Sequence, residues 1–170
     1  MTRHRTIIIA LAAVATMALA MPLHTPRLLL WNASASVPVG LYWLRPAIHL
    51  HVGDLVAVQP STPLARYLAV RGYLPVGVPL LKHILALPGH TVCRISRAVT
   101  IDGTGVADAL DRDHLGRLLP IWQGCRTLRA GEVFLLNRQS QSSFDGRYFG
   151  PLPFASIVGR AVPLWTETPR

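Results

Sequence analysis

The chain has 170 residues, of which 51% are hydrophobic and 15% are charged, and its formal net charge is +9. This length suits one domain with a core of its own, and the high apolar content excludes an intrinsically disordered chain. The arginines form no cluster and no stripe interleaved with aromatic residues, so we interpret the charge as a basic surface near anionic lipid and expect no nucleic-acid partner.

The N-terminal segment, residues 1–27, predicts a membrane anchor. Arg3 and Arg5 precede an apolar run over residues 7–21 that contains no charge. This pattern predicts a single transmembrane helix whose N-terminus stays in the cytoplasm. A cleaved signal peptide is the alternative, because the Ala-Leu-Ala sequence at 18–20 resembles a cleavage site. Both interpretations place the rest of the chain outside the cytoplasm.

Residues 28–170 are predicted to form a mainly β domain with antiparallel strands and one short helix. Recurring proline and glycine favour many turns. The helix is expected to begin at Ser61 or Thr62, either of which can cap it, with Pro63 in the first helical position. Gly72 is expected to end it. The predicted strands are residues 39–44, 54–59, 80–87, 91–101, 131–136 and 157–165, with a hairpin turn at 102–105 and an irregular surface excursion over 106–125.

The two cysteines, Cys93 and Cys125, form an even pair in a domain expected outside the cytoplasm. In such a compartment a disulfide is more common than a reactive thiol. Neither cysteine belongs to a Cys-x-x-Cys motif, and no His/Cys spacing resembles a zinc site. The nearest approach is His-Leu-His at 49–51, where both imidazoles would share one face of a strand. We expect no metal there and no cofactor in the protein.

Lys82 is the single lysine in a chain with sixteen arginines, and it lies in the apolar run LLKHILAL. A guanidinium keeps its proton at any accessible pH, whereas an ammonium group can lose it. Burial among leucine and isoleucine lowers the pKa of a lysine, so Lys82 is a candidate general base. The alternative is a lysine whose stem lies along the edge of the core while its amine reaches water.

Candidate nucleophiles lie in NASASVP, where Ser34 and Ser36 alternate ahead of a proline and a glycine. Serines in loops are usually just solvated, but a Ser–Lys pair supplies a nucleophile and a base without histidine. In SSFDGRYF, Asp145 and Arg147 can pair on one face. This pair is interpreted either as a structural salt bridge within a turn or as a scaffold that brings Ser143 toward the lysine.

These stretches occur in the order found in one family. The chain resembles the signal peptidase I-like serine proteases with a Ser–Lys dyad, and among them the conjugative-transfer branch of TraF-type pilin-processing peptidases. The resemblance covers nearly the whole chain and implies a signal-peptidase-like β domain. The segments that carry it are SASVPVGLYW (34–43), LLKHILALPGHTVC (80–93), SSFDGRYFGPLP (142–153) and IVGRAVPLW (157–165).

The resemblance also implies a role for each candidate residue. Ser36 matches the nucleophile and Lys82 matches the general base. Ser34 matches the side chain that helps the backbone N–H of Ser36 to bind the oxyanion. Ser143 matches the hydroxyl that orients the lysine.

The last motif contains both matches and departures. Asp145 and Arg147 match its acidic and basic residues, and in the conjugative branch that aspartate is associated with joining the pilin ends into a ring. Gly146 replaces a serine, and residues 136–138 read Leu-Asn-Arg instead of Gly-Asp-Asn. Val37 stands where the ordinary signal peptidase has methionine. The departures and the small domain favour a dedicated conjugative enzyme.

The resulting prediction is a membrane-anchored serine endopeptidase of the bacterial inner membrane, with its N-terminus cytoplasmic and its catalytic domain periplasmic. Its expected partners are the lipid bilayer and an exported prepilin or preprotein, which it processes to a linear or cyclic product. The resemblance implies small residues at the P1 and P3 positions of the substrate. Two alternatives remain open. One is a general type I signal peptidase that removes signal peptides from exported proteins, and the other is a non-catalytic envelope scaffold of a secretion apparatus.

Overall fold

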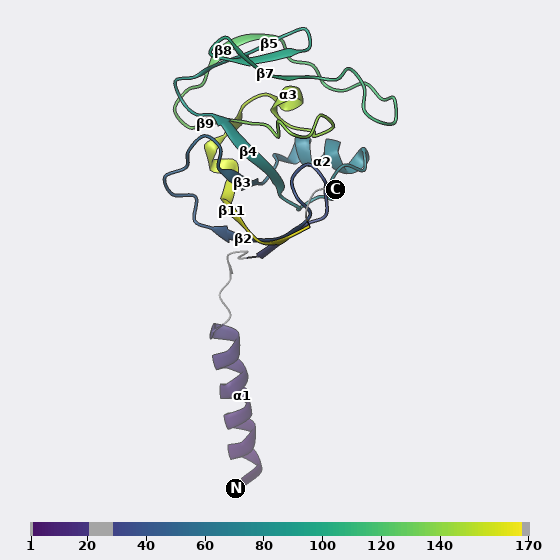
Figure 1. The fold of residues 1–170 in the computed structure, drawn as a ribbon. Coiled ribbons are helices and arrows are strands. Elements are labelled where there is room, and N and C mark those ends of the chain that lie inside the picture. The colour runs from purple at the N-terminus through teal and green to yellow at the C-terminus, as the bar shows by residue number, and fades with distance from the viewer. Residues whose placement is uncertain (1, 21–28, 168–170) are drawn as a thin grey trace.

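The computed structural model describes residues 2–20 and 29–167 (Figure 1). Helix α1 (Thr2–Ala20) lies in the first range, and the β-rich domain is formed by the second. Among these described residues, no helix combines the length and the apolar character needed to cross a bilayer. The structure therefore does not show the transmembrane helix predicted in residues 1–27, of which 1 and 21–27 lie outside the described residues.

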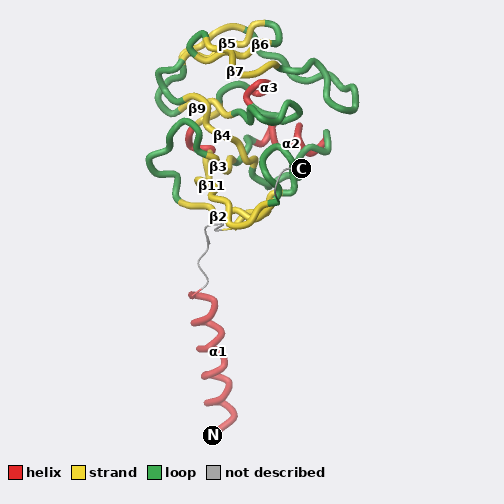
Figure 2. Tube along the Cα trace, viewed as in Figure 1, coloured by secondary structure: helices red, strands yellow, loops and turns green. Residues whose placement is uncertain are grey.

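The strands of the domain form two sheets in which every named pairing is antiparallel (Figures 1 and 2). The larger sheet has the order β1 (Leu29–Asn32), β2 (Gly40–Arg45), β11 (Ile157–Thr166), β3 (Leu55–Val58), β4 (Leu80–Ala86), β9 (Glu132–Leu135) and β10 (Leu152–Pro153). The smaller sheet has the order β7 (Thr104–Asp108), β6 (Ala98–Ile101), β5 (Thr91–Ile95) and β8 (Gly124–Thr127). The predicted mainly β, antiparallel fold class is confirmed.

The helices of the domain are α2 (Thr62–Val70), α3 (Gly146–Phe149) and the 3-10 turn η1 (Phe154–Ser156). The predicted helix is α2, which begins with proline in its first turn and ends ahead of Gly72, whose φ of 69° suits glycine. Ser61, one of the two predicted caps, occupies the N-cap position, but its side chain makes no capping hydrogen bond. Helix α3 was not predicted, because four residues after a capping Asp145 are too few to show a helical period.

The observed strands differ from the predicted ones in two ways: β1, β7, β8 and β10 were not predicted as strands, and the single strand predicted over residues 91–101 is two strands. This segment forms β5 and β6, which are separated by a tight turn in which Ser96 has a φ of 55°. The predicted hairpin at 102–105 is present, since Asp102 and Gly103 have positive φ between β6 and β7.

The excursion after β7 was predicted to be a surface segment, and this is only partly right. It contains little regular structure, but Ala109 is fully buried and Leu119 is 8% exposed, and both pack with Tyr148. Apolar side chains at these two positions therefore hold the excursion against the domain.

Strand β4 lies inside the larger sheet and contributes to three groups of buried side chains. Leu81 packs in the first group with Tyr42 and Ala57, Ile84 belongs to the second, and Ala86 belongs to the third. Strand β3 pairs with residues 80–83 of β4, and β9 pairs with Ile84 and Ala86. This pairing fixes the backbone position from which the side chain of Lys82 extends.

Candidate active site

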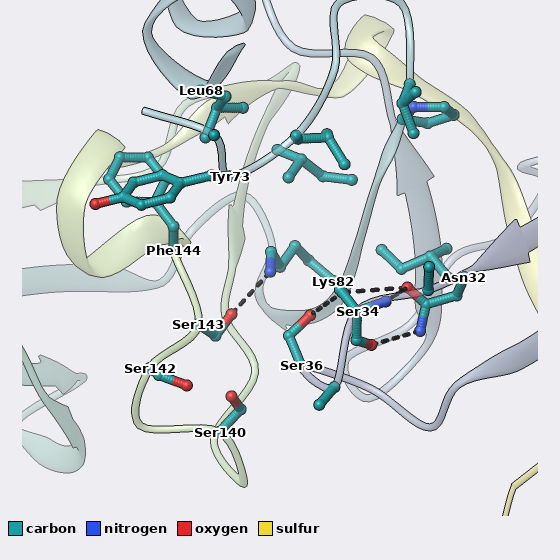
Figure 3. A pocket seen from close by; sticks show the side chains of 18 of the residues that line it. Asn32, Ser34, Ser36, Leu68, Tyr73, Lys82, Ser140, Ser142, Ser143 and Phe144 are labelled. Atoms are coloured by element: carbon teal, nitrogen blue, oxygen red, sulfur yellow. Dashed lines mark hydrogen bonds between the residues drawn. The ribbon is translucent and has the colours of Figure 1, made fainter. Parts of the chain in front are cut away.

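A cavity of about 630 Å³ opens between the loop after β1, strand β4 and the loop after β9. Ser34, Ser36, Lys82 and Ser143 all line it, although the chain separates them by more than a hundred residues. Figure 3 shows the side chains of Ser36, Lys82 and Ser143 pointing into the same space. The structure thus brings together the four residues to which the resemblance gives the roles of nucleophile, base, oxyanion donor and lysine-orienting hydroxyl.

The loop that carries the two serines is organised by Asn32, which the sequence analysis did not identify. Its Nδ2 donates to the carbonyl oxygens of Ser34 (2.8 Å), Val37 (3.1 Å) and Pro38 (3.0 Å). Its Oδ1 accepts from both the backbone N–H and the hydroxyl of Ser34, each at 3.1 Å. Asn32 is only 8% exposed, so one buried amide determines the shape of the loop.

The hydroxyls of Ser34 and Ser36 lie 3.1 Å apart, so one donates to the other. Ser34 is exposed and Ser36 is partly buried, whereas the next residue, Val37, is buried in the core. The loop leaves toward β2 at Gly40, where an added Cβ would lie 2.2 Å from the carbonyl oxygen of Trp165. Glycine is therefore required where this loop ends.

Lys82 is 3% exposed, and its Nζ donates to the hydroxyl of Ser143 over 2.7 Å. Removal from water lowers the pKa of Lys82 from 10.5 to about 8, because burial disfavours the charged form; Asp145 partly offsets this effect, and Arg147 adds to it. The alternative in which the amine reaches bulk water is wrong. Figure 3 shows the amine on the side of the strand that faces the hydroxyls of both Ser143 and Ser36.

Asp145 and Arg147 lie behind this amine as a buried ion pair, with 0% and 1% exposure. The Nε and Nη2 of Arg147 donate to the two carboxylate oxygens over 2.9 and 2.8 Å. Nη2 also donates to the carbonyl oxygens of Ser140 (2.6 Å) and Ser143 (3.2 Å). The backbone N–H of Asn137 donates to Asp145 over 3.1 Å. The two interpretations of this pair therefore coincide, because the salt bridge also holds the backbone that carries the Ser143 hydroxyl.

Two departures from the family motif have structural reasons. An added Cβ at Gly146 would lie 2.6 Å from the carbonyl oxygen of Leu135, so the serine of the motif does not fit here. Asn137, noted in the sequence only as a departure from the motif, forms hydrogen bonds with the backbone on both sides of Lys82. Its Nδ2 donates to the Leu81 carbonyl and its Oδ1 accepts from the His83 N–H, each at 3.1 Å. The sequence feature that could have identified Asn137 is its position, as a polar residue directly after an apolar strand.

The smaller sheet is tied to this site by a third buried cation. Cys93 and Cys125 face each other on β5 and β8 and form a disulfide with an S–S distance of 2.01 Å. The next residue, Arg94, is 1% exposed, and its Nη1 donates to the carbonyl oxygens of Arg147 (2.5 Å) and Pro120 (3.2 Å). Arg94 thus links the sheet that contains the disulfide to the helix behind the lysine.

No metal is indicated at the histidines noted in the sequence. Residues 49–51 lie in the loop between β2 and β3, where His49 has a φ of 50°, so they do not share a strand face. Within the described ranges, no three His, Cys, Asp or Glu side chains converge to hold a metal ion.

Comparison with known proteins shows the family of this chain. The model for "Signal peptidase, peptidase S26" matches residues 1–165. The conjugal transfer protein TraF of Agrobacterium fabrum is 35% identical over 151 residues, which cover 81% of this chain and 82% of that protein. A plasmid transfer protein TraF of Escherichia coli is 31% identical over 144 residues, 79% of this chain and 81% of the relative. A probable signal peptidase I-1 of Synechocystis is 30% identical over 119 residues, 67% of this chain and 55% of that protein. The chain therefore belongs to the signal peptidase family of serine peptidases, peptidase S26.

Proposed function

We propose that the protein is a serine endopeptidase in which Ser36 is the nucleophile and Lys82 is the general base. The observation that carries the proposal is the buried amine, which lines the same cavity as the Ser36 hydroxyl and has its pKa lowered to about 8. A base with a pKa near the working pH is deprotonated often enough to act and still basic enough to accept a proton. An arginine at this position could not do this.

In the first step, neutral Lys82 takes the proton of Ser36 while the Oγ attacks the scissile carbonyl carbon. The carbon–nitrogen bond then breaks, and the proton passes from Nζ to the leaving amine. The hydroxyl of Ser143 keeps the amine directed into the cavity through its 2.7 Å hydrogen bond. Lys82 ends this step neutral, and Ser36 carries the acyl group as an ester.

The developing oxyanion would be held by the backbone N–H of Ser36 and the hydroxyl of Ser34. The Ser34 hydroxyl donates to Asn32 at rest, so its hydrogen must turn toward the oxyanion as the charge forms. The backbone N–H of Ser34 also donates to the Asn32 Oδ1, and this bond keeps the loop in place while the hydroxyl turns.

The acyl-enzyme is released by water or by an amine of the same substrate chain. In the first case Lys82 takes a proton from water and the product is linear. In the second case a new peptide bond forms and the product is a ring, with a mass one water lower than that of the trimmed linear chain. Asp145 is fully buried, so an effect of this residue on ring closure acts through Ser143 and the lysine rather than by contact with substrate.

The proposed substrate is an exported prepilin of a conjugative system. Support comes from the motifs of the resemblance and from relatives whose names concern conjugal and plasmid transfer. The similarity to a probable signal peptidase I-1 favours the second candidate, a general signal peptidase. A panel with one prepilin and several ordinary preproteins separates them, because a dedicated enzyme leaves the ordinary preproteins uncut.

The proposed location is the periplasmic face of the inner membrane, with the N-terminal segment as the anchor. The two arginines ahead of an apolar run and the disulfide in the domain support this location. Protease added to spheroplasts should degrade the domain, and carbonate extraction of the membranes should leave the chain in the pellet. Protection of the domain from external protease would contradict the proposal.

The dyad is tested with Lys82→Arg and Ser36→Ala in the full chain. Both variants should lose cleavage by at least about a thousandfold while the circular dichroism spectrum is retained. A serine-directed acylating probe should label the wild type at Ser36 and should label neither variant. Retained cleavage in Lys82→Arg would remove the proposed base, and an unlabelled wild type would favour the non-catalytic scaffold.

A further inference from the structure

The catalytic cavity continues beyond the hydroxyls and the amine into an apolar lobe, which we call the aromatic lobe. The side chains that line it are Leu68, Tyr73, Leu110, Leu119, Phe144 and Tyr148. They come from helix α2 and the residues just after it, from the excursion between β7 and β8, and from the segment that follows Ser143. None of these six residues belongs to the dyad or to its hydrogen-bond partners.

The lobe has rigid walls. The ring of Phe144 stacks on Tyr148 with centroids 5.2 Å apart and lies 5.5 Å from the ring of Tyr73. The hydroxyl of Tyr148 accepts from the backbone N–H of Leu110 over 3.0 Å, which holds the excursion in place. Leu119 and Tyr148 are buried, whereas Leu110, Tyr73 and Phe144 are partly exposed to the cavity. The wall is therefore a preformed apolar surface with its polar atoms already bonded.

The lobe directly adjoins the reacting groups. Phe144 follows Ser143, the residue that holds the Lys82 amine. Figure 3 shows Leu68, Tyr73 and Phe144 on one side of the amine, and Ser34 and Asn32 on the other. A polypeptide whose scissile bond lies at Ser36 thus passes within reach of this apolar surface.

The one carboxylate among the lining residues of the lobe region is already satisfied, so it does not mark a cation site. The Oδ1 of Asp113 accepts from the backbone N–H groups of Leu115 (3.0 Å) and Arg117 (2.9 Å). Its Oδ2 accepts from the Tyr73 hydroxyl and, over 2.8 Å, from the Nε of Arg117. These bonds also clamp the excursion to the end of α2, where Arg71 donates to the carbonyl of Leu118 over 2.9 Å. Apart from the exposed His114, the side chains left for a ligand in the lobe region are apolar.

We propose that the aromatic lobe is a substrate subsite for one bulky apolar side chain, of the size of leucine or phenylalanine, near the scissile bond. The proposal rests on the proposed endopeptidase function, because the same substrate chain must occupy the lobe and the dyad. Exported precursors carry apolar segments next to the processed region, so a side chain of this kind is available. A concave apolar surface beside a few polar groups is the usual form of a specificity pocket.

Binding to the full-length Ser36→Ala chain tests the subsite without turnover. The probes are labelled alanine-rich peptides in which a single leucine is moved through six consecutive positions, with affinity measured by fluorescence anisotropy. At one position leucine should tighten binding by about tenfold over alanine, the effect of burying a few methylene groups. Equal affinity for all peptides, or no binding of any of them, overturns the subsite.

Two tryptophan substitutions locate the effect. Leu110→Trp fills the lobe from the excursion and should reduce the leucine preference to less than about twofold. Leu115→Trp is the matched control, since Leu115 lies in the same excursion, is 63% exposed and does not line the cavity; it should keep the full preference. An unchanged preference in Leu110→Trp overturns the subsite.

The same peptides given to the enzyme with Ser36 intact separate this inference from the proposed function. Cleavage of all peptides at one rate sinks the subsite and leaves the peptidase. Leucine-dependent binding without any cleavage sinks the peptidase and leaves the subsite.

Discussion

Two buried charged groups lie side by side in this domain, and they are built in opposite ways. Arg147 meets Asp145 in a bidentate ion pair and also holds two backbone carbonyl oxygens. Lys82 is as deeply buried, yet among the described residues its amine forms no ion pair and donates to a neutral hydroxyl. The paired charges fix the shape of the loop, whereas the unpaired amine keeps a lowered pKa of about 8.

The ion pair and the lone amine depend on each other. The carboxylate of Asp145 alone would raise the pKa of Lys82, and Arg147 opposes that effect. The guanidinium therefore does two things: it holds the backbone of Ser143, and it balances the charge of the aspartate next to the base. Single substitutions can separate these two contributions.

Asp145→Asn should strongly lower the free energy of unfolding. Removing one partner leaves the Arg147 guanidinium buried without its counter-charge, which costs about 3–5 kcal/mol of the free energy of unfolding. Urea denaturation followed by circular dichroism measures this loss. Asp111→Asn is the control, because its contact with Arg97 is 3.9 Å long and both side chains are more than half exposed; it should change stability little. Equal stability of the two variants would contradict the role of the pair.

Lys82→Met should raise the free energy of unfolding at neutral pH, which is the opposite of the effect of Asp145→Asn. The pKa of Lys82 is lower in the folded chain, at about 8, than its ordinary value of 10.5, so the folded chain binds fewer protons between these two values. The free energy of unfolding of the wild type should therefore rise with pH across this window by about 3 kcal/mol relative to Lys82→Met. Denaturation of both proteins from pH 7 to 10.5 tests this, and a constant difference would contradict the burial of the amine.

Ser143→Ala should affect the amine rather than the pair. The lost hydroxyl accepts a hydrogen bond that favours the charged amine, so the pKa of Lys82 should fall further while the amine loses its direction. The maximal kcat/KM for a peptide substrate should fall by about 10- to 100-fold, and its acidic limb should move to lower pH. Ser142→Ala, one residue earlier, is the matched control and should leave both unchanged. A lower kcat/KM with an unmoved limb would indicate a purely structural role for Ser143.

Arg94→Lys should give the smallest effect. Arg94 is a buried cation like Lys82, but it donates to carbonyl oxygens of Arg147, Pro120 and Ser96. Lysine cannot reproduce this fork of donors, so we expect a loss of about 1–2 kcal/mol in the free energy of unfolding and a smaller decrease in kcat/KM. Arg112→Lys, on the exposed excursion, is the control for the substitution itself. No change in either quantity would leave Arg94 without a positioning role.

The sequence was informative where a residue differs in polarity from its neighbours in the chain. A single lysine among leucines indicated a candidate buried amine, with an amine that reaches water as the alternative, and the structure buries it in β4. Each predicted strand lies in an apolar run between turn residues and matched an observed strand within about two residues, except at the turn around Ser96, whereas β1, β7, β8 and β10 were missed. These features are local, so a single sequence contains them.

The parts that could not be predicted depend on contacts between distant segments. Asn32 and Asn137 look like ordinary loop asparagines, and only the fold brings their amides against the serine loop and the backbone of β4. The helix after Asp145 has four residues, which is too short to show the periodic spacing of apolar residues that predicts a helix. The aromatic lobe requires three segments that the sequence leaves far apart, and its excursion looked polar because its few apolar anchors are scattered.

The most direct test of the account is a titration of the Lys82 amine itself. Because this is the one lysine of the chain, protein labelled with 13C at the lysine Cε gives a single side-chain signal whose chemical shift follows its protonation. The account predicts a midpoint near pH 8, since burial removes the amine from water. A midpoint near the ordinary value of 10.5 would mean that the amine is hydrated and charged at neutral pH, and Lys82 would then not be the base.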